Sequence, residues 1–370
     1  MPVYKDEKLK TYFYVFYTGK DLITGKPKRV KKRGFATEKE ANKAMIKAMN
    51  DFNEGDYIEP SKKKLGDYLV NVWLPLRKDL GRATVIVYEG YIKNQIINSG
   101  FGENQLSKLT SNHIQAFIIL LRKTLSENTV KRVYSLLRSS LQDAVTMKLI
   151  KENPATTIVG KPKYEQPEIQ VWNKDECRIF LDSIIGRSRY SLAIRLALFT
   201  GMRQGEVLGL RWKAIDFDNK MISITHTASH DGKEIRSKTK TKSSRRSIPI
   251  DEETLKELVR HRKLINEERK TVPDYQDNDL VFCTSTGRIC TPRNLMRAFY
   301  DFLKENKVPK IRFHDLRHTH ATLLLRSGIN PKIVSERLGH SSVKITLDTY
   351  SHMLPDIQEK AVESMNLLLN

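Results

Sequence analysis

The sequence predicts a multidomain, mostly α-helical protein. A small β-sheet-plus-helix module comes first, a helical domain follows, and an α+β domain ends the chain. Strand-like aromatic residues open the sequence, four segments with helical spacing follow, and helix and strand patterns mix in the remainder. Polar, charged stretches that contain proline separate these parts. We therefore place the domains at residues 1–59, 62–157 and 168–370 of the 370 residues.

The first module is predicted from two strands and one helix. YFYVFY at 12–17 has the composition of a strand, and a turn-rich stretch connects it to a returning basic strand that ends near Phe35. Thr37, with Glu40 three residues later, forms the pattern of a capping box. It predicts a helix that continues to about Asn53.

The helical domain is predicted from apolar residues at three- and four-residue spacing. Four segments have this pattern: 65–76, 83–96, 109–125 and 129–150. We interpret their apolar stripes as core. Ser126 or Asn128 is expected to begin the last of these helices, and Asn153-Pro154 to end it.

The last domain has helices on both sides of a strand-rich middle, which includes KMISITH and EIRSKTKTKSSRRSIPI. Near the C-terminus, Ile357, Ala361, Met365 and Leu368 form one stripe of an amphipathic helix. From the sequence, this helix can pack either within its own chain or against a neighbouring one.

Composition favours a polyanionic partner. Lys and Arg number 65 against 43 Asp and Glu, a formal charge of +22, so nucleic acid is the first candidate. Two runs, Lys26–Arg33 and Arg236–Arg246, each hold six basic residues and no acidic one. A β-ribbon fits the DNA major groove, which favours contacts from the first run. The candidate DNA contacts are Lys28, Arg29, Lys31, Lys32, Arg33, Lys131, Arg132, Arg138, Lys238, Lys242 and Arg245.

Other classes are disfavoured. No stretch is apolar for the length of a membrane helix, and the first residues, MPVYKDEKLK, do not resemble a signal peptide. The three cysteines, Cys177, Cys283 and Cys290, are odd in number and lack the spacing of metal ligands. They predict ordinary thiols in a reducing interior, and hence a cytoplasmic protein.

The stretch FHDLRHTHATLL, 313–324, concentrates histidines around an arginine. His314 and His318 have the spacing of two metal ligands, but Arg317 lies on the same helical face. A guanidinium keeps its proton and repels a metal dication. This face therefore suits an oxyanion, above all a phosphate. His318 and His320 are expected to pack and form hydrogen bonds beside it.

Three further stretches provide partners for such a phosphate. In TGMRQGEVLGLRW, Arg203 is expected at a helix N-terminus, and Glu206 is placed to hold that region by hydrogen bonding. In the second basic run, Lys240 can swing toward a phosphate and supply a proton, although Lys238 and Lys242 compete for this role. In LGHSSVKITLDTY, His340 precedes Tyr350, whose phenolate nearby arginines are expected to favour.

Together, Arg203, Lys240, His314, Arg317, His340 and Tyr350 resemble the signature of the tyrosine recombinases, the phage integrase family. The match covers most of the last domain, and the three-part layout resembles integrases of temperate phages and conjugative transposons from Gram-positive bacteria. The resemblance implies an arm-type DNA-binding module, a core-type DNA-binding domain and a catalytic domain. It also implies a bacterial, nucleoid-associated enzyme that integrates and excises a mobile element.

The resemblance further implies the chemistry. Tyr350 attacks a DNA phosphate to give a 3′-phosphotyrosyl link, Arg203 and Arg317 stabilise the transition state, and Lys240 protonates the leaving oxygen. His314 and His340 add donors, and His314 is the expected base. No metal and no cofactor are expected. The implied partners are duplex DNA at attachment sites, a homotetramer on that DNA, a directionality factor and a host DNA-bending protein.

Three other functions remain open from the residues alone. A sequence-specific DNA-binding regulator explains the charge but has no need of Tyr350. A metal-dependent nuclease explains the histidines, but a carboxylate cluster for two metals is not recognisable in the sequence. A type IB-like topoisomerase uses the same chemistry on a single duplex.

Overall fold

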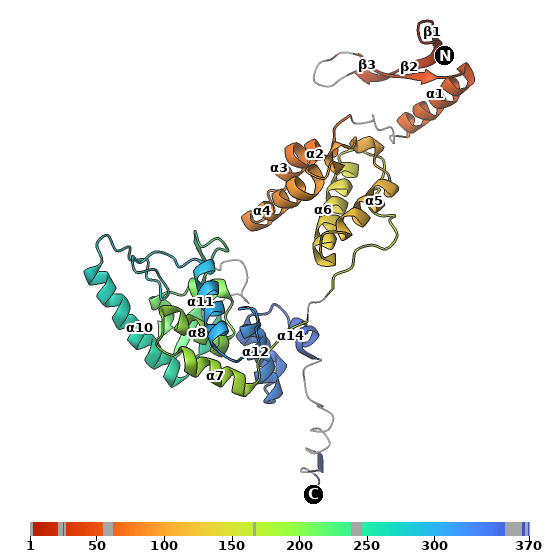
Figure 1. The fold of residues 1–370 in the computed structure, drawn as a ribbon. Helices are drawn as coiled ribbons and strands as arrows, with labels where there is room; N and C mark the ends of the chain where they lie inside the picture. Colours follow the sequence, from red (N-terminus) through yellow and green to blue (C-terminus); the bar gives the residue numbers. More distant parts are fainter. Residues whose placement is uncertain are drawn as a thin grey trace. The chain divides into compact units, whose positions relative to one another are not determined.

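The computed structural model describes residues 3–20, 25, 27–54, 62–165, 168–237, 246–351, 365, 366 and 369. The chain divides into two compact units, Met1–Gln166 and Pro167–Asn370. Figure 1 shows the fold of each. In the described ranges, no helix combines the length and the apolar composition that a membrane span requires.

The chain begins with an antiparallel sheet in the order β1-β2-β3 and one helix. The elements are β1 (Val3–Asp6), β2 (Thr11–Lys20), β3 (Pro27–Phe35) and α1 (Glu38–Asn53). The predicted helix start is confirmed, since Thr37 Oγ1 accepts a hydrogen bond from the Glu40 N–H at 3.3 Å. Tyr14, Phe16 and Val30 on the sheet pack against Met45 of α1 in a small core.

The helical part follows the predicted segments. Its elements are α2 (Leu65–Tyr68), η1 (Leu69–Trp73), α3 (Leu74–Leu76), α4 (Arg82–Tyr91), η2 (Ile92–Ile97), η3 (Phe101–Glu103), η4 (Leu106–Lys108), α5 (Ser111–Arg122) and α6 (Glu127–Thr146). Apolar faces of these helices form one core around Trp73 and Tyr134. Ser126 is the N-cap of α6, one of the two predicted starts.

The predicted end of α6 is wrong. The helix ends at Thr146 because Lys148 adopts a left-handed conformation with φ 55°, and the Leu149 N–H donates to the Ala144 carbonyl at 2.9 Å. Asn153 contributes in another way: its Nδ2 donates to the Arg138 carbonyl at 2.9 Å. A turn therefore stops this helix before the proline can.

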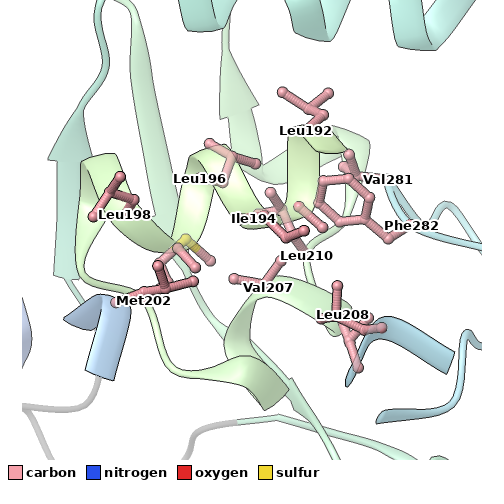
Figure 2. Close-up of a cluster of buried hydrophobic side chains, with 14 of the residues drawn as sticks. Leu192, Ile194, Leu196, Leu198, Met202, Val207, Leu208, Leu210, Val281 and Phe282 are labelled. Carbon is pink, nitrogen blue, oxygen red and sulfur yellow. The ribbon is translucent and has the colours of Figure 1, made fainter. Parts of the chain in front are cut away.

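The second unit is built around a larger core (Figure 2). Its first elements are α7 (Lys174–Ile184), α8 (Arg189–Thr200), α9 (Gln204–Leu208) and η5 (Trp212–Ala214). Figure 2 shows side chains of α8 and α9, among them Ile194 and Val207, gathered with Val281 and Phe282. Because both helices share this core, the short turn between them is held in place.

Short strands lie between α9 and the later helices. They are β4 (Ile215–Asp216), β5 (Met221–Ile224), β6 (His226–Ala228), β7 (Ile235–Ser237) and β8 (Arg246–Pro249). One antiparallel sheet has the order β4-β5-β8, and β6 pairs with β7. The predicted strand character of this region is confirmed on both sides of residues 238–245, which lie outside the described ranges.

The remaining helices are α10 (Glu252–Thr271), α11 (Pro292–Glu305), α12 (Asp315–Arg326), α13 (Pro331–Leu338) and α14 (Val343–Tyr350). Helix α12 packs against α8 and α13, and α13 packs against α14. The amphipathic segment predicted after Leu354 lies outside the described residues, apart from positions 365, 366 and 369.

Candidate active site

Arg203 lies directly after the turn that ends α8. Gly201 permits this turn, because its φ is 66° and a Cβ there would approach Leu338 Cδ2 to 2.6 Å and His320 Cδ2 to 2.8 Å. Arg203 is the N-cap of α9, as the sequence predicts. Its side chain is 43% exposed, so its guanidinium remains accessible to a ligand.

Glu206 forms ion pairs with Arg203 and with a second arginine. The Arg203 N–H donates to Glu206 Oε2 at 3.0 Å, and Arg203 Nη1 donates to Oε1 at 2.9 Å. Arg246, at the start of β8, donates from Nη2 to Glu206 Oε2 at 2.8 Å and from Nε to the Arg337 carbonyl at 2.6 Å. The predicted supporting role of Glu206 therefore has a geometric basis: one buried carboxylate balances two cations.

Arg246 is absent from the residues singled out in the sequence. A signal for it exists, because strand alternation places Arg246 on the same face as Ile248, which is fully buried. Its side chain is only 7% exposed. The last residue of the second basic run is thus part of the buried scaffold, whereas Lys238, Lys242 and Arg245 of that run were expected to contact DNA and Lys240 to act in catalysis.

Replacing Glu206 by Ala is expected to destabilise the second unit by about 3–5 kcal/mol, because it leaves Arg246 buried without its carboxylate. The side chain of Glu206 is 1% exposed, so water cannot substitute for it. Urea unfolding of the full chain, followed by tryptophan fluorescence, measures the loss. Lys304→Ala is the matched control, because it breaks the solvent-exposed pair with Asp301 at 3.2 Å and should cost under about 1 kcal/mol. Equal stability of the two variants would contradict the expectation.

Arg317 connects the segments that carry the other candidate residues. Its Nη1 donates to the Gly201 carbonyl at 2.6 Å and its Nη2 to the Leu338 carbonyl at 2.8 Å. Gly201 lies two residues before Arg203, and Leu338 lies two residues before His340. Burial, together with the charge of Arg203, lowers the pKa of Arg317 to about 9. Arg317 thus stays protonated at neutral pH while it fixes two loops of the site.

Tyr350, the last residue of α14, lies against α12. Its side chain is 1% exposed, and its hydroxyl is 2.8 Å from Nδ1 of His318. Burial raises the pKa of Tyr350 to about 12, although Arg317 and Arg203 act in the opposite direction. The two arginines favour the phenolate, as expected, but desolvation outweighs them, so the phenol keeps its proton at neutral pH.

The histidines of α12 differ in position. His314, the N-cap of α12, is exposed, whereas His318, one turn later, is half-buried and contacts Tyr350. The rings of His314 and His318 meet edge to face, with centroids 5.0 Å apart. Partial burial, then Arg317 and Arg203, lowers the pKa of His314. The contact of His318 with Tyr350 was not anticipated, although the four-residue spacing of the two histidines already placed them on one face.

His340 follows Gly339, which ends α13 with φ 67°. Nδ1 of His340 lies 2.8 Å from Thr346 Oγ1, a contact that orients the ring. Burial, then the charges of Arg317 and Arg203, lowers the pKa of His340 to about 4. Arg317 binds the turns that lead to Arg203 and His340, and His318 contacts both His314 and Tyr350. These contacts gather the five side chains into one site, and the charges of the two arginines reach His314, His340 and Tyr350 alike.

His320 points away from this site, as predicted. Its Nε2 accepts a hydrogen bond from Arg337 Nε at 3.1 Å, and it is 7% exposed. Burial, followed by the charge of Arg337, lowers the pKa of His320 to about 3. The neutral imidazole is therefore the form that the fold requires.

Acid should destabilise the second unit through His320. The unfolded chain binds a proton near pH 6.5, whereas the folded chain binds it only near pH 3, so stability is full above pH 6.5 and declines as pH falls. At pH 4.5 the loss from His320 alone is expected to be about 2–3 kcal/mol. Hydrogen exchange in peptides of α12 and α13 between pH 4.5 and 7, corrected for the intrinsic rate, measures it. His320→Gln should flatten the slope; an unchanged slope would contradict this assignment.

The remaining candidates fall into three groups. Lys238, Lys240, Lys242 and Arg245 lie outside the described residues. Helix α6 exposes Arg132 and Arg138, and Lys131 Nζ lies 5.6 Å from the centroid of the Tyr134 ring. Strand β3 carries Lys28, Arg29, Lys31, Lys32 and Arg33.

The cations of β3 include a set on the face turned away from α1. Val30 faces the α1 core, so Arg29 and Lys31 on either side of it face outward. Lys31 Nζ lies 4.4 Å from the centroid of the Phe13 ring, and the guanidinium of Arg29 lies 5.8 Å from that of Tyr17. Exposed cations supported by aromatic rings form a surface suited to phosphates. Among the described residues, no group of three His, Cys, Asp or Glu side chains is placed to bind a metal ion.

Three family models match successive parts of the chain. The model of an arm DNA-binding domain matches residues 2–51, and that of the phage integrase N-terminal SAM-like domain matches 67–121. The model of the phage integrase family matches 173–356, which includes every described residue of the candidate active site.

Individual relatives match along most of the chain. A tyrosine recombinase XerC-like protein of Caldanaerobacter subterraneus subsp. tengcongensis is 32% identical over 352 residues, 89% of this chain and 90% of that protein. The ICEBs1 integrase of Bacillus subtilis is 28% identical over 359 residues, 95% of each chain.

Solved structures share the fold. The Tn1549 transposon integrase in complex with transposon right end DNA has a TM-score of 0.68 at 22% identity, covering 82% of this chain and 99% of that one. The lambda integrase tetramer bound to a Holliday junction has a TM-score of 0.62 at 18% identity, covering 96% and 95%.

Proposed function

The chain belongs to the phage integrase family of tyrosine recombinases, and from this premise we propose that Tyr350 cuts and rejoins DNA through a 3′-phosphotyrosyl intermediate. The recombinase would thereby integrate and excise a mobile element in the bacterial nucleoid. One observation carries the proposal. The hydroxyl of Tyr350 lies beside the imidazole of His318, in a site where the charges of Arg203 and Arg317 both favour its deprotonated form.

The cationic set suits the charge that develops during this reaction. Attack of the phenol on a phosphodiester builds negative charge on the non-bridging oxygens. Arg203, half-exposed beside the buried Glu206, presents a guanidinium that can donate two hydrogen bonds to them. Arg317 adds a second fixed cation, and His314 and His340 are proposed to donate as well. Glu206 positions Arg203, and the Gly201 and Leu338 carbonyls position Arg317, before any substrate binds. Little reorganisation is therefore needed when negative charge develops on the phosphate.

A covalent intermediate explains how strands are exchanged without hydrolysis. The bond from Tyr350 to phosphorus replaces the bond to the 5′-oxygen, so a 5′-hydroxyl from a partner strand can reverse the step. Lys240 is proposed to protonate the leaving 5′-oxygen. The site residues alone supply these roles, and no metal or nucleotide cofactor enters the proposed scheme.

The proposed partners are duplex DNA and further copies of the chain. Outward-facing Arg29 and Lys31 on β3 and the exposed Arg132 and Arg138 on α6 support contacts to DNA phosphates. The related lambda integrase is a tetramer on a Holliday junction, which supports a homotetramer here. An arm-type first module supports a directionality factor and a host DNA-bending protein as additional partners.

The function is tested by trapping the intermediate. The full chain is incubated with DNA that flanks its own coding region, intact and with a nick beside the scissile position, in EDTA. After SDS quenching, a DNA band that is retarded until protease is added is the expected result. Specific binding to the nicked DNA without such a band would favour a DNA-binding regulator that does not cleave.

A further inference from the structure

The hydroxyl of Tyr350 is paired with a residue outside the set recognised in the sequence. His318 Nδ1 lies 2.8 Å from this hydroxyl, and the two ring centroids are 5.6 Å apart. The two residues come from α12 and from the end of α14, which are joined through a shared core with α13 that includes Tyr350 itself. The contact is therefore built into the packing of three helices.

The protonation states of both groups allow the phenol to donate this hydrogen bond. Burial, then the neighbouring His314, lowers the pKa of His318 to about 4, so its imidazole is neutral at pH 7 and has one free lone pair. The phenol of Tyr350 keeps its proton, since burial raises its pKa to about 12. A buried O–H needs an acceptor, and Nδ1 is at the right distance. With the proton of the neutral imidazole on Nε2, the phenol donates and Nδ1 accepts.

His314 and His318 differ in solvent exposure, which favours different roles for them. His314 is exposed at the start of α12, whereas His318, one turn later, is half-buried. The rings stand edge to face at 5.0 Å, so His314 borders His318 without replacing it at the hydroxyl. Among the described residues, His318 is the group within hydrogen-bonding distance of Tyr350 Oη.

We propose that His318, rather than His314, accepts the phenolic proton of Tyr350 as the tyrosine attacks DNA. This inference rests on the proposed function and deepens it. The bond from Oη to phosphorus forms, the bond from phosphorus to the 5′-oxygen breaks, and the proton on Oη moves to Nδ1 of His318. The electron pair of the broken bond leaves on the 5′-oxygen, which Lys240 protonates. His314 remains a donor to the phosphate.

Three substitutions at position 318 distinguish a role of His318 as hydrogen-bond and proton acceptor from a role in packing alone. His318→Leu removes the acceptor, and the rate of adduct formation on nicked DNA should fall about 100-fold. His318→Asn places an amide oxygen where Nδ1 was, so it should recover part of the rate through the hydrogen bond. His318→Gln places its oxygen nearer the former Nε2 and should recover less. DNA affinity, measured by gel shift, should change less than threefold in all three variants.

Two altered reactants distinguish a proton acceptor from a structural residue. A substrate with sulfur in place of the bridging 5′-oxygen has a leaving group that needs no proton, so it should not restore the rate of His318→Leu. A fluorinated tyrosine at position 350 has a more acidic phenol and depends less on a base. Incorporated into the His318→Leu variant, it should raise the rate of adduct formation at least tenfold.

The outcomes are decisive in each direction. A His318→Leu variant that cleaves within threefold of the wild type, or faster, would overturn the proposal. So would restoration by the sulfur substrate, or no restoration by the fluorinated tyrosine. If the wild-type chain itself forms no adduct on nicked DNA that it binds, the proposed function fails, a result separate from those for His318.

Discussion

Tyr350→Phe should abolish the covalent protein–DNA adduct completely while leaving DNA binding unchanged. The substitution removes one oxygen, the proposed nucleophile, and keeps the ring that packs with Ala321, Val334 and Leu338. The measurement is SDS-resistant adduct on nicked DNA in EDTA, with gel-shift affinity determined in parallel.

The control for this variant is its own stability. Loss of one hydrogen bond to His318 should cost only about 1 kcal/mol, because the half-buried imidazole can bind water in its place. Thermal unfolding of Tyr350→Phe should therefore stay within a few degrees of the wild type. An adduct that persists in Tyr350→Phe would assign the nucleophile to another residue, which proteolysis and mass spectrometry of the DNA-linked peptide would identify.

Much of the fold follows from local sequence signals. Thr37 and Ser126 begin helices as predicted, and Gly201 ends one, because caps and left-handed turns depend on a few adjacent atoms. The end of α6 was missed because nothing in TMKLI marks the left-handed conformation of Lys148. A turn closed by the hydrogen bond from the Leu149 N–H to the Ala144 carbonyl ends the helix before the proline six residues after Lys148.

The residue types of the site were predicted, but the net shift in the pKa of Tyr350 was not. Residue types alone place cations near a phenol, and cations favour the phenolate. Whether they win depends on how much water the phenol loses, and Tyr350 is 1% exposed. The ion pair of Arg246 could not be predicted for a similar reason, because its buried contact with Glu206 joins residues 40 positions apart. Desolvation and long-range contacts are properties of the packed chain, which no short motif encodes.

The second large effect is expected for Arg317→Lys. Lysine keeps the charge, but a single ammonium cannot reproduce a planar fork that donates to two carbonyls and also makes the proposed phosphate contact. The carbonyls of Gly201 and Leu338 each lose a donor, at about 1–3 kcal/mol for each that stays buried and unpaired. These carbonyls belong to the turns that lead to Arg203 and His340. The substitution thus removes one donor from the site and loosens two others.

Adduct formation by Arg317→Lys on nicked DNA should therefore fall at least 10²–10³-fold, the effect of losing one preorganised donor, with further loss from displaced neighbours. Single-turnover rates are measured well below the unfolding temperature of the variant, so that only folded protein contributes. Arg326→Lys, an exposed substitution on the same helix, is the matched control and should retain the wild-type rate. A wild-type rate in Arg317→Lys would mean that charge alone suffices at this position. Rate loss with intact hydrogen-exchange protection of α8 and α13 would assign the whole effect to the phosphate contact. Loss of both would show that the same guanidinium organises the site and acts in it.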